Sequence, residues 1–105
     1  MRANIARHGG DPGAIVLMGH SAGAHIAALV AVDPQWLRGA GVPRSAIAGV
    51  IAVSGAGYDI ADGETYRLLG RSHNWYARRF HTEDTPSWIY EASPVHYLDA
   101  ADPPF

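Results

Sequence analysis

Residues 14–29 read A-I-V-L-M-G-H-S-A-G-A-H-I-A-A-L, and this stretch decides the fold. Its first part, Ala14 to Met18, is a continuous apolar run, which is typical of a parallel strand covered on both faces. From Ala22 to Val32 the chain is rich in Ala, Leu, Ile and Val, and no Pro interrupts it. A helix that is apolar on nearly every side is usually buried. We therefore predict a strand, a tight turn from Gly19 to Gly23, and a buried helix.

The turn has the form G-x-S-x-G, with Ser21 between Gly19 and Gly23. Between a strand and a helix, this pattern is typical of a nucleophile elbow, which presents the serine hydroxyl at the carboxyl edge of the sheet. Such a turn is strained by about 1–3 kcal/mol, and we expect a side chain at either glycine to collide with the chain. The N–H of Ala22 would be an oxyanion-hole donor. The alternative is an ordinary turn with an idle serine.

The rest of the chain supports an α/β fold. Ile47 to Ser54 is a second continuous apolar run, which predicts a central parallel strand. Strand, helix and strand then form one right-handed βαβ unit. Helix start and end signals predict further helical pieces. They are residues 2–8, ended by Gly9 and Gly10, residues 34–38, preceded by Asp33, and residues 86–92, preceded by Thr85, with a loop over residues 39–44.

Composition excludes several classes of function. The chain has 105 residues, 48% of them hydrophobic, and a net charge of −2. This charge does not favour nucleic acid or an anionic membrane surface. The absence of Cys excludes a disulfide, a thiolate nucleophile and a thiolate metal site. No apolar run approaches the roughly 20 residues of a membrane span, and no secretory signal opens the chain, so we expect a cytoplasmic protein. His20, His25 and Asp59 lack the spacing of a zinc motif, and no cofactor is expected.

Two segments carry a resemblance to a known family. Residues 3–12 (A-N-I-A-R-H-G-G-D-P) and 19–25 (G-H-S-A-G-A-H) resemble the α/β-hydrolase superfamily, and within it the serine esterases of the kynurenine-formamidase, feruloyl-esterase and carboxylesterase-like group. The resemblance implies that residues 1–105 are one partial α/β-hydrolase domain, a central fragment of a larger doubly wound sheet. It also implies hydrolysis of small-molecule carboxylic esters or related amides through an acyl-enzyme on Ser21.

The resemblance also implies where the other parts of the site lie. Residues 60–80 correspond to a variable excursion over the active site. In the family, the catalytic acid and then the histidine follow the strand that a Pro-Pro-Phe like residues 103–105 opens, and this chain stops before both. Because loss of the base of a triad lowers turnover by about six orders of magnitude, we expect the chain to be nearly inactive alone.

Other residues of the chain are candidates for the site. Asp59 follows the second strand at the same sheet edge as Ser21 and could orient a base, although an Asp in such a turn more often caps its own loop. We expect His20 and Tyr58 to lie near the substrate. As a base, His20 would point away from its neighbour Ser21, and His25 would approach from the helix side, so a packed His25 is favoured.

Two other classes of function stay open. A non-catalytic remnant or pseudoenzyme would bind partners or ligands without turnover, because two parallel strands alone leave sheet edges that must be paired. An acyltransferase or thioesterase could use the same Gly-His-Ser-x-Gly turn. The apolar faces that two strands and a few helices leave uncovered also predict poor solubility or partial folding of the isolated chain.

Overall fold

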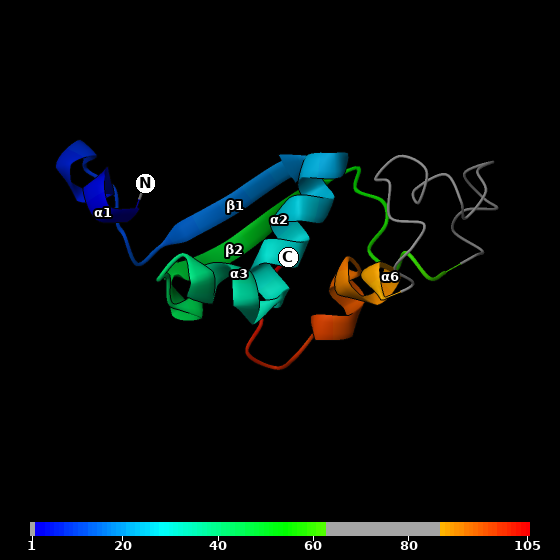
Figure 1. Cartoon of the computed structure of the whole chain (residues 1–105). Coiled ribbons are helices and arrows are strands. Elements are labelled where there is room, and N and C mark those ends of the chain that lie inside the picture. Colours follow the sequence, from blue (N-terminus) through cyan, green and yellow to red (C-terminus); the bar gives the residue numbers. More distant parts are fainter. Residues whose placement is uncertain (1, 63–86) are drawn as a thin grey trace.

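A βαβ unit forms the centre of the structure. A computed structural model describes residues 2–62 and 87–105. In it, strand β1 (Ile15–His20), helix α2 (Ala22–Val32) and strand β2 (Ile47–Val53) follow one another. The two strands are parallel, hydrogen-bonded neighbours, as the two apolar runs predict. Figure 1 shows that α2 begins beside the end of β1 and runs back along the strands.

The register of the sheet brings the carboxyl ends of the two strands level. Ile15 pairs with Ile47, and after an irregularity the pairing continues until His20 lies opposite Val53. The ladder extends one residue beyond β1, because the backbone nitrogen of Ser21 donates to the Val53 carbonyl oxygen at 2.9 Å. Parallel sheets bind ligands at this edge. The residues that follow both strands therefore lie at the carboxyl edge of the sheet, where a site is expected.

One face of the sheet packs against α2. Val50 is 4% exposed and forms a cluster with Ala27 and Ala31 of the helix, on which Leu17 and Ala52 also pack. The helix residues of this cluster are alanines, whose small side chains allow a close approach to the strands. The core of the described residues therefore lies between α2 and the two strands.

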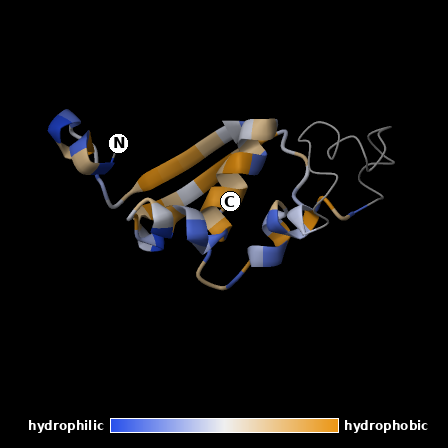
Figure 2. Ribbon diagram, in the orientation of Figure 1, coloured by the Kyte–Doolittle hydropathy of each residue, from blue (hydrophilic) through white to orange (hydrophobic). Residues whose placement is uncertain are grey.

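The other face of the sheet is exposed. Large apolar residues alternate along both strands with those that face α2, and they are Val16 (54% exposed), Met18 (72%), Ile51 (48%) and Val53 (39%). Ile26 of α2 is also 60% exposed. Figure 2 shows the hydrophobic colour along both strands. The prediction of a sheet covered on both faces and a helix buried on every side is therefore wrong for the described residues, which form only two layers.

The first helical piece ends as the sequence indicates. Helix α1 (Arg2–Ile5) continues into a 3-10 turn, η1 (Ala6–His8). Gly9 then takes the left-handed conformation at φ 79° and donates its N–H to the Ala6 carbonyl, which is a common helix ending. In Figure 1 this piece lies beyond the start of β1, away from α2.

Helix α3 (Pro34–Gly39) also matches its predicted start. Asp33 caps it, because its Oδ1 accepts a hydrogen bond from the Gln35 backbone nitrogen at 3.0 Å. At the end of the predicted loop over residues 39–44, a further 3-10 turn, η2 (Arg44–Ala46), begins and continues to the start of β2. Pro43 opens this turn, and its carbonyl accepts from the Ala46 nitrogen at 2.9 Å.

The C-terminal segment returns to the sheet. It contains helix α6 (Trp88–Glu91) and the 3-10 turn η3 (Pro94–Tyr97); the predicted cap at Thr85 and most of the predicted excursion lie outside the described residues. The carbonyl of Pro104 accepts from the Val50 nitrogen at 2.9 Å. Successive residues of a strand bond to opposite sides. Val53, three residues after Val50, bonds toward β1, so Pro104 lies at the other edge of β2.

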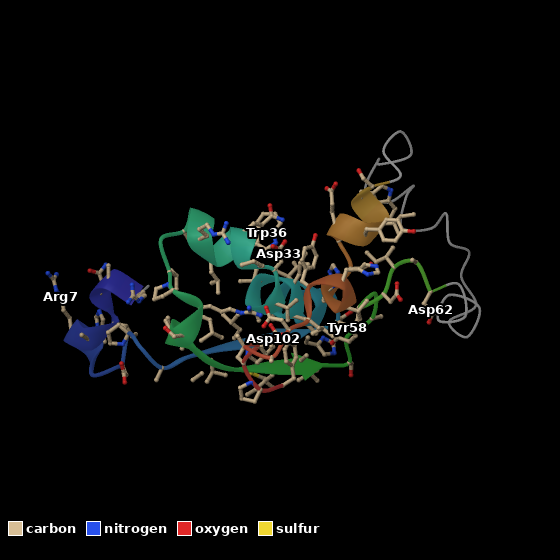
Figure 3. All side chains as sticks on the ribbon, turned by 90° about the horizontal axis from the view of Figure 1, so that it is seen from below. Arg7, Asp33, Trp36, Tyr58, Asp62 and Asp102 are labelled. Carbon is tan, nitrogen blue, oxygen red and sulfur yellow. The ribbon has the colours of Figure 1, made fainter. Side chains whose placement is uncertain are left out.

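An ion-pair cluster fixes this segment. Arg44 of η2 contacts the Asp99 carboxylate at 2.8 Å and also pairs with Asp102, which Figure 3 places over the middle of the molecule. The Arg44 side chain is 21% exposed and that of Asp102 is 12% exposed.

Among the helices that the structure describes, none is long and apolar enough to cross a membrane.

Candidate active site

Ser21 is the single residue between β1 and α2. Its backbone has φ 54° and ψ −119°, a conformation that is strained for any residue with a side chain. The turn is therefore much shorter than predicted: Gly19 and His20 belong to the strand, and Ala22 and Gly23 belong to the helix. Ser21 is exposed. The chain thus reverses from strand to helix at one strained and accessible serine.

The two glycines that flank Ser21 have different roles. A Cβ on Gly19 would lie 2.6 Å from the Ala24 nitrogen and still closer to the carbonyl group of Gly23. Only glycine allows this approach of strand and helix, as predicted. A Cβ on Gly23 would meet nothing within 4 Å in the described structure. The prediction of a collision at Gly23 is therefore wrong, because this position of the first helical turn faces open space.

The start of α2 leaves backbone donors beside Ser21. The Ser21 carbonyl accepts from the nitrogens of Ala24, at 3.0 Å, and His25, at 3.3 Å. The N–H of Ala22 has no backbone acceptor within the described part of the chain, and Ala22 is exposed. Free N–H groups at the start of an 11-residue helix favour a developing negative charge.

The two histidines of the motif take different places. His25 lies partly buried in α2, and its Nε2 is 2.7 Å from the carbonyl oxygen of Ala92. This contact favours the packed histidine over the base, as the sequence indicates. His20 is the last residue of β1, opposite Val53, and is exposed. Within residues 2–62 and 87–105, neither ring forms a hydrogen bond with the Ser21 hydroxyl.

Asp59 caps its own loop. Its Oδ1 accepts from the backbone nitrogen of Ala61 at 2.9 Å, which is the alternative that the sequence left open beside a role as catalytic acid. Its carboxylate has no histidine partner among the described residues. The candidate acid therefore holds the turn after β2, and the structure does not bring it into a pair with a base.

Tyr58 lies between the end of β2 and the C-terminal segment (Figure 3). Its carbonyl accepts from the Val95 nitrogen at 3.2 Å. Its ring lines an apolar cavity of about 300 Å³ together with Ala28 and Val32 of α2. Ser21 is not among the residues that line this cavity.

Two serines were not predicted as important. Ser54, the residue after β2, has φ 49°. Ser93 is fully buried; it accepts from the Ile60 nitrogen at 2.8 Å and donates to the Ile89 carbonyl at 2.6 Å. A sequence signal for Ser54 was present, because the pair Ser54-Gly55 follows the end of a predicted parallel strand. No sequence pattern marks Ser93 as a buried bridge, because the Ile60 nitrogen that it joins to Ile89 lies 33 positions away along the chain.

The pKa shifts of the described residues belong to the C-terminal segment. Burial raises the pKa of the Tyr97 hydroxyl, and the nearby Asp33 and Glu91 raise it further. The hydrogen bond from Arg44 lowers the pKa of Asp99, with help from the Ala101 N–H. No group of three His, Asp or Glu residues in the described part of the chain could hold a metal ion.

Together, these features define a partial α/β-hydrolase fold: two parallel strands, a helix after the first, and a strained serine where strand and helix meet. The BD-FAE family model matches residues 1–105, and the chain belongs to this family.

The chain is similar to two curated proteins of Mycobacterium tuberculosis (strain ATCC 25618 / H37Rv). It is 34% identical to "Esterase LipQ" over 109 residues, which cover 100% of this chain and 26% of LipQ. It is 29% identical to "Probable carboxylic ester hydrolase LipM" over 111 residues, which cover 100% of this chain and 25% of LipM. The chain therefore spans about a quarter of the length of these relatives. No solved structure matches it.

Proposed function

We propose that these residues form the nucleophile part of a serine carboxylic-ester hydrolase that acts on small-molecule esters or related amides. The observation that carries the proposal is the backbone of Ser21, strained at φ 54° between β1 and α2. A hydroxyl held at such a point is exposed to a substrate at the carboxyl edge of the sheet. The printed names of LipQ and LipM, an esterase and a probable carboxylic ester hydrolase, support the same class.

In the proposed reaction, the Ser21 oxygen attacks the ester carbonyl carbon while a base takes the hydroxyl proton. The carbonyl oxygen becomes an oxyanion, which the free N–H of Ala22 would stabilise; one such donor contributes about 2.7–4 kcal/mol. The alcohol leaves with a proton from the base, and water then hydrolyses the acyl-enzyme. His20 and Tyr58 are proposed to lie near the acyl or alcohol group.

The base and the acid are proposed to come from outside the described residues. His25 is bonded to Ala92 and Asp59 to Ala61, so neither is placed as a partner of Ser21. A serine without its base and acid retains roughly 10³–10⁴-fold catalysis over water from the oxyanion hole and binding. We therefore expect the isolated 105-residue chain to turn over esters extremely slowly.

The test is covalent labelling of Ser21. A fluorophosphonate probe should modify the full-length gene product at Ser21, as located by mass spectrometry of the labelled peptide. Labelling and ester hydrolysis should both disappear in Ser21→Ala and persist in Ser45→Ala, which changes an exposed serine at the other end of β2. Label on another residue in the wild type, or hydrolysis that survives Ser21→Ala, would overturn the proposal.

A non-catalytic binding module is the second candidate. It is favoured by the exposed apolar residues on one face of the sheet, such as Met18 at 72% and Val16 at 54%, because contiguous apolar surface often marks an interaction site. This candidate predicts concentration-dependent association of the purified chain in analytical ultracentrifugation, with no labelling of Ser21 in any longer gene product. Labelling that depends on Ser21 decides for the hydrolase.

A further inference from the structure

Two serines with positive φ follow the ends of neighbouring strands. Ser21 has φ 54° and Ser54 has φ 49°, and among the described residues these are the non-glycine positions with positive φ. Strand pairing ends with His20 opposite Val53, so Ser21 and Ser54 are the next residue of each strand. Because paired strands lie about 4.8 Å apart, both serines occupy one small area of the carboxyl edge.

The residue after Ser54, Gly55, lies in a tightly packed position. A Cβ on Gly55 would overlap the Tyr58 hydroxyl and lie 2.9 Å from the Ala24 Cβ. Ala24 is fully buried in the first turn of α2. The residue after Ser54 is therefore packed against the same helical turn that follows Ser21. Strained residues persist only where packing enforces them, and they concentrate at functional sites.

The Ser54 hydroxyl is available to a ligand. Ser54 is exposed, and within residues 2–62 and 87–105 its side chain forms no hydrogen bond. Glycine would adopt φ 49° without strain, so the backbone conformation does not explain why the residue at this position is serine. The group that serine adds is a hydroxyl, which can both donate and accept a hydrogen bond.

We propose that Ser54 is a substrate contact of the Ser21 site. Its hydroxyl donates a hydrogen bond to an oxygen atom of the acyl group, next to the carbonyl that Ser21 attacks. The site then prefers esters whose acyl group carries an ether or hydroxyl oxygen beside the ester over plain alkyl esters of the same length. This inference rests on the proposed role of Ser21 and adds the class of acyl group.

The experiment compares two esters that differ by one atom. p-Nitrophenyl methoxyacetate has an oxygen where p-nitrophenyl butyrate has a methylene group, so their acyl groups have the same length. In the full-length gene product, Ser54→Ala and Ser54→Gly should each lower kcat/KM for the methoxyacetate about five- to tenfold relative to the wild type, the effect of one lost neutral hydrogen bond. The value for the butyrate should stay within about twofold.

The glycine variant separates the hydroxyl from the backbone, because it keeps φ 49° without strain. A loss in Ser54→Ala that Ser54→Gly does not share would assign the effect to backbone conformation and overturn the inference. Equal losses on both esters, or no loss on either, would also overturn it. Thermal unfolding and the rate of fluorophosphonate labelling check that the variants are folded. If Ser54→Ala does not fold, the result for Ser54→Gly decides the question. Ser45→Ala is the control variant.

The failure of the inference and that of the proposed function give different results. If the wild type hydrolyses neither ester in a manner that depends on Ser21, the proposed function fails and this inference fails with it. If the wild type is active, loses activity in Ser21→Ala, and treats both esters alike in the Ser54 variants, the inference alone fails.

Discussion

His25 Nε2 lies 2.7 Å from the carbonyl oxygen of Ala92, 67 positions further along the chain. A carbonyl oxygen can only accept, so Nε2 is the donor. The bond joins the beginning of α2 to the segment after α6. The histidine closest to Ser21 on the helix is therefore a structural tie between distant parts of the chain.

We predict that His25→Leu lowers the free energy of unfolding by about 1–3 kcal/mol, because it leaves a part-buried carbonyl without its partner. Ser21 labelling by fluorophosphonate in the full-length gene product should continue. His8→Leu, at an exposed histidine of η1, should change stability by less than about 0.5 kcal/mol. Loss of labelling in a fully stable His25→Leu protein would make His25 the base instead.

The two glycines of the motif should respond in opposite ways to alanine. Gly19→Ala places a methyl group against the backbone of Gly23 and Ala24, which cannot move without shifting α2, so we expect little soluble protein. Gly23→Ala meets no atom within 4 Å and should leave stability unchanged or raise it by up to about 1 kcal/mol, the helix propensity of alanine over glycine. Soluble yield and thermal midpoint measure both; equal damage would contradict the described contacts.

Ser93 should be the most sensitive serine for stability. Ser93→Ala leaves the Ile60 N–H and the Ile89 carbonyl without their buried partner, which we expect to reduce the free energy of unfolding by about 1–3 kcal/mol. Hydrogen exchange at the Ile60 amide should accelerate. Ser87→Ala, at an exposed serine without a capping bond, should be neutral. Unchanged exchange at Ile60 in Ser93→Ala would refute the prediction.

The Arg44–Asp99 ion pair predicts an acid-dependent contribution to stability. The bond from Arg44 lowers the pKa of Asp99 in the folded state, so the contribution is complete above the unfolded-state value of about 3.9. It is lost as the pH falls through the folded-state value below that. Asp99→Asn should flatten the fall in thermal midpoint below about pH 4 and should have little further effect in an Arg44→Gln background. An unchanged acid dependence would argue against the pair.

The elements of the fold were predictable because each depends on local sequence. The apolar runs gave β1 and β2, and Asp33-Pro34 gave the capped start of α3. The extent of the turn was not predictable, since Gly19 and His20 remain in the strand only because β2 pairs with them. The apolar runs alone favoured a sheet covered on both faces, whereas the exposed face agrees with the expectation that two strands and a few helices leave apolar faces uncovered. An apolar run shows that a face can be buried and does not show what covers it.

The candidate site was predictable in part for the same reason. The motif located Ser21, and the structure gives it a strained backbone between strand and helix. The alternatives that the sequence favoured for His25 and Asp59 match their contacts with Ala92 and Ala61. The room beside Gly23 and the position of Ser54 next to Ser21 could not be derived, because they depend on helix orientation and strand register.

The bond between Val50 and Pro104 makes the two edges of this sheet differ in how readily they can pair with another chain. Pro104 occupies the outer side of β2 and, having no N–H, cannot extend a ladder at its own position. In the described sheet, the outer side of β1 has no partner at any position, so it is the more open edge for another chain, beside the exposed Val16 and Met18. Domain swapping or fibril growth would begin at β1, and a lysine at Met18 would act there as a gatekeeper.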